Sequence, residues 1–238
     1  MKLSIWLSVS LFSFEHLAPI FFFLTLGGLC IFIANRYLEP RGQRILGGLW
    51  GLIALLGVVL RATYLISQGE FSIEEELPIH LCRILAIAAP FALYYKNKMA
   101  LGILYFSIYA GTLNANLTPD VDGAFPDVKY FAYWMMHSSL LVVPWYSVAV
   151  YKYKIGWKDF VNAFYFLNLY FVGITLINWI LGSNYFYTCY KPVSGTLLDH
   201  FGEWPMYVII TYLLGLLLMI IVYIPWWIRS RANRNREE

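Results

Sequence analysis

The chain has 238 residues, of which 60% are hydrophobic, 19% aromatic and only 13% charged, with a net charge of +3. Soluble domains carry about a quarter of their residues as Asp, Glu, Lys or Arg. The charges here stand in short clusters between long apolar runs, and a helix needs roughly 20 apolar residues to cross a bilayer. Composition therefore excludes a soluble globular domain, and no nucleic-acid-binding motif accompanies the small positive charge.

Seven apolar runs predict an all-α, polytopic membrane protein made of one domain that covers residues 1–238. Backbone groups in lipid must be paired within the protein, which favours helices, and the alternating pattern of a membrane β-barrel is absent. The predicted transmembrane helices are 16–35, 45–65, 77–95, 99–117, 130–151, 157–181 and 204–228.

The orientation follows from the Lys and Arg residues between the spans. Short loops rich in these residues stay in the cytoplasm. Twelve lie on one side and three, Lys2, Lys129 and Lys191, on the other, so we expect the N-terminus outside and the C-terminus in the cytoplasm. The twelve are Arg36, Arg41, Arg44, Lys96, Lys98, Lys152, Lys154, Lys158, Arg229, Arg231, Arg234 and Arg236.

Polar residues within spans are costly in hydrocarbon and are therefore site candidates. Most of those in this chain map to the outer half of the membrane and come from several spans. They include His80, Cys82 and Arg83 in the third span, Asn114 to Asp120 at the end of the fourth, His137 in the fifth, and Asn184 after the sixth.

Cys82 is the candidate nucleophile. Pro78 suits the first position of the third helix, which places Cys82 about one turn inside a helix N-terminus. That position, beside Arg83, favours the thiolate. His137 is the preferred base, because His80 lies about 200° away from Cys82 around the helix.

Each of these residues also has a structural interpretation. Cys82 can be a buried small apolar residue, and His137 can form a hydrogen bond between helices. Asp120 and Asn184 are candidate substrate-binding residues together with Arg83, but they also suit turns and helix ends.

Metal binding is disfavoured. His80, Cys82, His137 and Asp120 form a conceivable ligand set, yet their spacing matches no zinc motif. We therefore expect no metal and no other cofactor. Cys82 and Cys189 both fall on the outer side, which leaves a disulfide between them open.

At these positions the sequence resembles the YwaF-like family of bacterial membrane proteins, which is related to eukaryotic transmembrane protein 164. The resemblance covers roughly residues 45–228. It implies a seven-helix fold, a bacterial cytoplasmic membrane and, from the eukaryotic branch, a phospholipid acyltransferase with Cys82, His80 and His137 in the active site. It rests on 77–83 (LPIHLCR), 117–120 (LTPD), 125–126 (FP), His137, 181–185 (LGSNY), 191–192 (KP) and 204–205 (WP).

The leading hypothesis is therefore a cysteine-dependent acyltransferase that acts on phospholipids and lysophospholipids from the outer leaflet through a thioester. Hydrolysis, in which water replaces the accepting lipid, is a close variant. A transporter is a second hypothesis, although the inner half of the spans is nearly free of polar residues, whereas a pore needs them at all depths. A ligand-binding or scaffold protein without catalysis is a third.

Overall fold

The structure, a computed structural model, describes residues 9–191 and 197–234. Lys2, Pro192 and Arg236, which contribute to the charge pattern or the resemblance, lie outside the described residues. Within them the chain is helical, with no β-strand. The elements are α1 (Phe14–Tyr37), α2 (Pro40–Gln68), α3 (Ile73–Glu76), α4 (Leu81–Tyr95), α5 (Lys98–Ser107), the π-helix η1 (Ile108–Thr112), α6 (Leu113–Leu117), α7 (Val128–Ala149), α8 (Trp157–Leu181), the 3₁₀-helices η2 (Tyr185–Tyr187) and η3 (Leu197–Phe201), and α9 (Met206–Arg234).

Four helices are long and apolar enough to cross a membrane, namely α1, α2, α8 and residues Met206–Ala232 of α9. This confirms the predicted all-α membrane protein. Each of the seven predicted spans overlaps a helical segment, and 157–181 coincides with α8. The remaining three correspond to the 15-residue α4, to the interrupted segment α5–η1–α6, and to α7.

Local sequence signals set several helix ends. The Ser13 hydroxyl accepts a hydrogen bond from the amide of His16 at the start of α1, and the Asp127 carboxylate accepts one from Lys129 at the start of α7. These are N-caps. Helices α2 and α8 end at Gly69 and Gly182, whose positive φ angles of 69° and 65° suit glycine.

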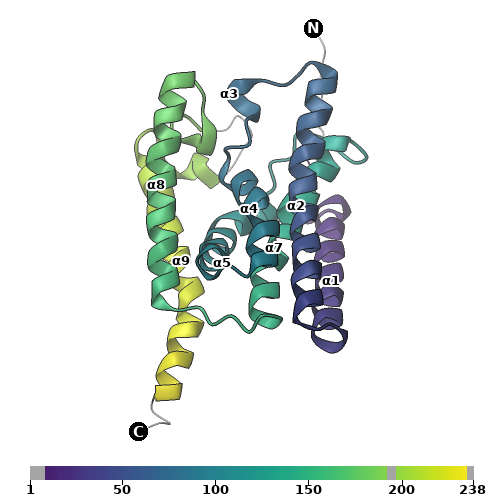
Figure 1. The fold of residues 1–238 in the computed structure, drawn as a ribbon. Helices are drawn as coiled ribbons and strands as arrows, with labels where there is room; N and C mark the ends of the chain where they lie inside the picture. Colours follow the sequence, from purple (N-terminus) through teal and green to yellow (C-terminus); the bar gives the residue numbers. More distant parts are fainter. Residues whose placement is uncertain (1–8, 192–196, 235–238) are drawn as a thin grey trace.

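Figure 1 shows α1 and α2 side by side on one flank and α8 with α9 on the other, with α4, α5 and α7 between them. Helix α7 is the centre of the core, packed against α1, α2 and α4. Its residues Leu140, Val142, Val143 and Tyr146 are completely buried. The short helix α3 lies at one end of the bundle, and the last turns of α9 extend beyond the other.

Glycines let α2 approach its neighbours closely. A Cβ atom added to Gly51 would lie 2.5 Å from the backbone nitrogen of Pro90 in α4, and one added to Gly57 would lie 2.8 Å from the carbonyl oxygen of Ala132 in α7. Small residues allow this close packing where hydrophobic association between helices is weak. The two contacts fix α4 and α7 relative to α2.

The start of the third predicted span differs from the prediction. Pro78 is not the first residue of a helix, because 77–80 form a turn and α4 begins only at Leu81. The cause is the side chain of Arg83, whose Nη1 donates hydrogen bonds to the carbonyl oxygens of Glu76 (2.8 Å) and Leu77 (3.0 Å). These carbonyl groups are thereby held in the turn instead of in helical hydrogen bonds.

Candidate active site around Cys82

Cys82 is the second residue of α4, directly after the N-cap residue His80 and Leu81. The first amide groups of a helix have no partner within it, and the His80 side chain does not cap them. The thiol therefore lies where partial positive charge is concentrated, which favours a negative charge on sulfur. The structure places Cys82 nearer to the helix start than the sequence predicted.

The nearest hydrogen-bonding partner of the thiol is Thr112, whose Oγ1 lies 3.5 Å from the Cys82 Sγ. Thr112 is the last residue of η1, which interrupts the helix formed by α5 and α6. Short π-helical segments of this kind are frequent at functional sites. Thr112 was missed in the sequence because nothing in residues 108–112 distinguishes a π-helix from an α-helix.

Two tyrosines complete the surroundings of the thiol. Tyr133 of α7 and Tyr170 of α8 are both close enough to Cys82 to interact with its charge. The Tyr170 hydroxyl donates a hydrogen bond to the Ile79 carbonyl oxygen (3.0 Å) in the turn before α4. The Cys82 region thus includes residues of α4, η1, α7 and α8. No motif in the sequence distinguishes Tyr133 or Tyr170 from the other tyrosines.

His137 lies on α7 next to this group. Its ring packs on Tyr133 with 4.1 Å between the ring centroids, and its Nδ1 lies 3.0 Å from the Tyr133 carbonyl oxygen. Because a carbonyl only accepts, Nδ1 carries the proton and Nε2 of the neutral ring is the basic nitrogen. No hydrogen bond to Nε2 occurs within 9–191 or 197–234, so this nitrogen is uncommitted.

His80 is the N-cap residue of α4. Its ring meets that of Tyr185 edge-to-face, with 4.9 Å between the centroids. His80 and His137 are close enough for their charges to interact. Among the described residues, neither histidine is hydrogen-bonded to Cys82; Tyr133 lies between Cys82 and His137, since it packs on the His137 ring and interacts with Cys82.

Arg83 is engaged within the protein. Besides the two carbonyl groups in the turn, its Nη2 donates to Glu76 Oε2 at 2.8 Å. Glu76 also pairs with Arg61 of α2, through Nε (3.0 Å) and Nη2 (2.7 Å). These side chains are only 10–19% exposed. The predicted substrate-binding role of Arg83 would require its Nη1 and Nη2 groups. These groups already donate to Glu76 and Leu77 and so hold α3 and α4 together.

The network continues to the loop before α7. Arg61 donates to both carboxylate oxygens of Asp122, at 2.8 and 3.1 Å, and Lys129 lies 3.8 Å from Asp122. Burial by itself would raise the pKa of Glu76 and of Asp122, but hydrogen bonds and charge from Arg61 outweigh it and hold both pKa values below the ordinary range. Both carboxylates are therefore ionised at neutral pH.

Asp120 and Asn184 lie further out. The amide of Asp120 donates to the Tyr133 hydroxyl at 3.3 Å, and its carboxylate accepts from Tyr187 at 3.5 Å. Burial, reinforced by Asp120, raises the pKa of Tyr187 to about 12, so this hydroxyl stays protonated. The side chain of Asn184 binds the backbone of Cys189 and Tyr190 and so closes its own loop.

A buried polar cluster supports α7 behind His137. The Asn116 amide donates to the carbonyl oxygens of Thr112 and His137, each at 3.2 Å, and its Oδ1 accepts from Ser138 at 2.8 Å. His16 Nε2 donates to the Asn116 carbonyl oxygen at 2.8 Å. Asn116 therefore fixes the end of η1 against α7, which sets the position of Thr112 relative to His137.

All three cysteines are free, so Cys82 and Cys189 are not linked. In the part of the chain that the structure describes, no three His, Cys, Asp or Glu side chains gather as a metal site would require.

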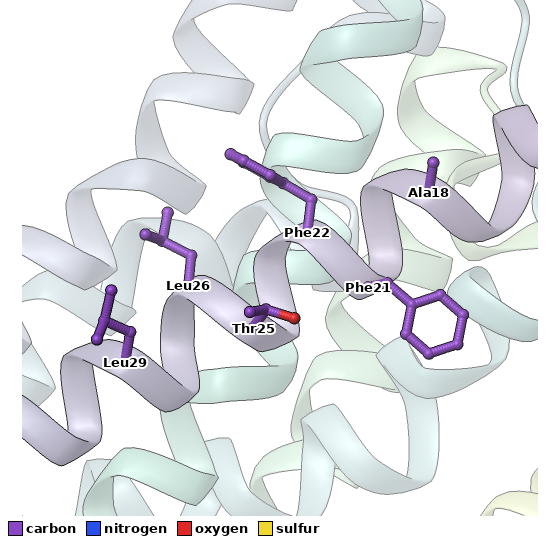
Figure 2. A pocket seen from close by; sticks show the side chains of 6 residues that line it. All are labelled: Ala18, Phe21, Phe22, Thr25, Leu26 and Leu29. Atoms are coloured by element: carbon purple, nitrogen blue, oxygen red, sulfur yellow. The ribbon is translucent and has the colours of Figure 1, made fainter.

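Two surface depressions lie away from Cys82. One is lined only by α1 side chains (Figure 2), and the other by Trp157, Ile220, Tyr223, Ile224 and Trp227. The α1 depression is apolar apart from Thr25 and follows a single helix, so it is a lipid-facing surface and not a catalytic pocket.

The family model that matches this chain is that of the TMEM164 family, over residues 11–223. The chain belongs to the TMEM164 family. The match covers the whole Cys82 region and agrees with the predicted resemblance. Comparison with curated proteins and with solved structures gave no match. With the apolar helices, membership in this family identifies an integral membrane protein.

Replacing Glu76 by glutamine tests the ion network. A buried arginine that loses its carboxylate partner is left with an uncompensated charge, so we expect Glu76→Gln to lower the free energy of unfolding by about 3 kcal/mol. The measurement is denaturant-induced unfolding of the purified protein in detergent. Glu75→Gln is the matched control, since Glu75 is exposed and forms none of the ion pairs. Equal stability of the two variants would contradict the role given to Glu76.

Proposed function

We propose that this protein is a membrane-embedded, cysteine-dependent lipid acyltransferase in which Cys82 is the nucleophile. The observation that supports this most strongly is the position of the Cys82 thiol, at the start of α4 and beside Thr112, with an uncommitted basic nitrogen on neighbouring His137. The activity implied by the resemblance agrees with this arrangement. A cysteine, a nearby base and free amide donors are the parts that acyl transfer requires.

In the first half of the reaction, His137 Nε2 removes the thiol proton and the Cys82 thiolate attacks the ester carbonyl carbon of a phospholipid. The ester C–O bond breaks as the C–S bond forms. The leaving alkoxide takes the proton from His137, so the products are a lysophospholipid and an acyl thioester on Cys82. Catalytic hydrogen bonds often tighten only in the substrate complex, so the proposal requires His137 to approach the thiol when substrate binds.

In the second half, the hydroxyl of another lysophospholipid attacks the thioester. His137 accepts the hydroxyl proton, a new ester bond forms, and the C–S bond breaks. The proton then returns to the Cys82 sulfur, which restores the free thiol. If water attacks instead, the product is a free fatty acid, and the enzyme is a lipid acyl hydrolase.

The oxyanion formed at each attack is best stabilised by backbone amides at the start of α4. These donors point out of the helix end, and the amide of Cys82 is the nearest one to the reacting sulfur. Arg83 is a weaker candidate for this role because Glu76 and two carbonyl groups already occupy its guanidinium. Arg83 would then contribute by positioning the turn before α4.

The proposal includes a topology of seven crossings, with the N-terminus outside and the C-terminus inside a bacterial cytoplasmic membrane. Helix α4 is short for a crossing, because its 15 residues span about 22 Å, less than the hydrocarbon thickness of about 30 Å. The turn before it supplies the missing length. A non-helical backbone is tolerated at such depth when its polar groups are paired within the protein, as Arg83 and Tyr170 pair them here.

Single cysteines on either side of α4 test this crossing. In a Cys189→Ser background, we expect Glu70→Cys to react with a membrane-impermeant maleimide in intact cells, and Lys96→Cys to react only after the membrane is permeabilised. Both positions are exposed. Labelling of both in intact cells would mean that α4 does not cross, and the seven-span topology would be wrong.

The catalytic proposal predicts that Cys82→Ser lowers acyl transfer by three orders of magnitude or more, and that His137→Gln lowers it by about 10²–10⁴-fold. The measurement follows a labelled acyl chain from phospholipid to lysophospholipid in proteoliposomes. Free fatty acid is quantified with and without the lysophospholipid acceptor, which separates transfer from hydrolysis.

Cys30→Ser is the matched control, because Cys30 is a partly exposed free cysteine on α1, away from α4. It should retain full activity. Unfolding of each variant is measured in parallel, so that a loss of activity is not a loss of folding. A stable, fully active Cys82→Ser protein would refute the proposed nucleophile.

A further inference from the structure

A second region suited to lipid lies at the other end of the bundle. Trp157 at the start of α8 and residues Ile220, Tyr223, Ile224 and Trp227 of α9 line a shallow groove. In Figure 1 the start of α8 and the last turns of α9 lie at the end of the bundle opposite α3. The groove is therefore distant from the turn and ion pairs that hold Cys82.

Packed aromatic rings form part of this groove. The rings of Trp157 and Phe160 stack with 5.0 Å between centroids and 10° between planes, and Tyr223 packs against both. The groove is accessible from outside, since its residues Trp157, Ile220 and Trp227 are 60%, 45% and 44% exposed. A preformed apolar surface of this kind binds a flexible chain without ordering costs of its own.

Positive charges stand at the mouth of the groove. The guanidinium of Arg231 lies 4.2 Å from the centre of the Trp227 ring, within the groove wall. Arg231 follows Trp227 by four residues and so lies on the groove face of α9. Lys158 is exposed and directly follows the groove residue Trp157. No ion pair in the described residues involves Arg231 or Lys158. Their charges are therefore available to an external anion.

We propose that this groove is a binding site for an anionic phospholipid, with one acyl chain along α9 and the phosphate near Arg231 and Lys158. The dimensions fit, because the eleven helical steps from Ile220 to Arg231 rise about 16 Å along the helix, close to half of the roughly 30 Å hydrocarbon thickness. An apolar groove that ends beside two basic side chains in no ion pair of the described residues matches the shape and charge of such a lipid.

Guanidinium groups bind phosphate through several hydrogen bonds at once, and basic residues near the membrane attract anionic lipid. A zwitterionic lipid of the same chain length offers the groove the same apolar contact but no net charge. The site should therefore select by headgroup charge. It involves none of the groups around Cys82, so it stands or falls separately from the proposed catalysis.

The test is native mass spectrometry of the full-length protein in detergent, titrated with phosphatidylglycerol or phosphatidylcholine that carry the same acyl chains. We expect the first phosphatidylglycerol to bind at least tenfold more tightly than the first phosphatidylcholine. Each basic residue near the surface contributes about fivefold to affinity, so Arg231→Gln with Lys158→Gln should remove most of this preference. Ile220→Trp, which fills the groove and keeps the charge, should weaken binding of both lipids.

Arg36→Gln is the matched control. Arg36 also lies over an aromatic ring, with its guanidinium 5.8 Å from the centre of Tyr37, but it borders neither depression. It should leave the lipid preference unchanged. Equal binding of the two lipids to the wild-type protein, or a loss in Arg36→Gln as large as in the double variant, would overturn the proposal. So would unchanged binding in Ile220→Trp.

Discussion

The carboxylate of Glu76 lies between the guanidinium groups of Arg61 and Arg83, and the form of the Cys82 region depends on this pairing. Removing the Glu76 carboxylate would leave the buried Arg83 guanidinium without its ion-pair partner, which is expensive in a low-dielectric interior. The pairing therefore fixes α3 against α2 and α4. It also lets Arg83 hold the carbonyl groups of Glu76 and Leu77, so that the helix begins at Leu81 instead of Pro78.

The late start of α4 has a chemical consequence. A continuous helix from Pro78 would have used the amides of Cys82 and Arg83 in helical hydrogen bonds. Because the turn ends at His80, these amides belong to the first turn, where they have no helical partner. Tyr170 pairs the Ile79 carbonyl oxygen in the same turn. The carbonyl groups of the turn are thus paired by side chains, whereas the first amide groups of α4 have no helical partner and lie next to the Cys82 thiol.

The two ends of the molecule differ in the kind of polar group they offer. Near α3, charges are paired with one another, and the groups outside the ion pairs include the Cys82 thiol, which is hydrogen-bonded to Thr112, and the His137 ring. Near the end of α9, Arg231 adjoins an apolar groove and forms no ion pair within the described residues. The first arrangement suits a reaction on a bound ester, and the second suits recognition of a charged headgroup. This division is why we place catalysis and lipid selection at different ends.

Much of the fold was predictable from the sequence because hydrophobic length alone defines a membrane helix. The segment 157–181 matches α8 at both ends. The start of α4 was not predictable, since it depends on where the Arg83 side chain points. The π-helix that brings Thr112 to Cys82 has no sequence signature. Tyr133 and Tyr170 are two of 19 tyrosines in the chain, and nothing in the sequence marks them as spatial neighbours of Cys82. Cys82 and His137 could be predicted as site candidates because polar residues within membrane spans are costly in hydrocarbon.

The reactivity of Cys82 tests the account most directly. The purified protein is treated with a thiol-reactive probe that carries an acyl chain, and the labelled residue and its rate are followed by mass spectrometry in the wild-type protein and in His137→Gln. The account predicts that Cys82 is modified faster than Cys30 and that the advantage falls when His137 is replaced. No modification of Cys82, or a rate indifferent to His137, would show that Cys82 is a packing residue and would contradict the account.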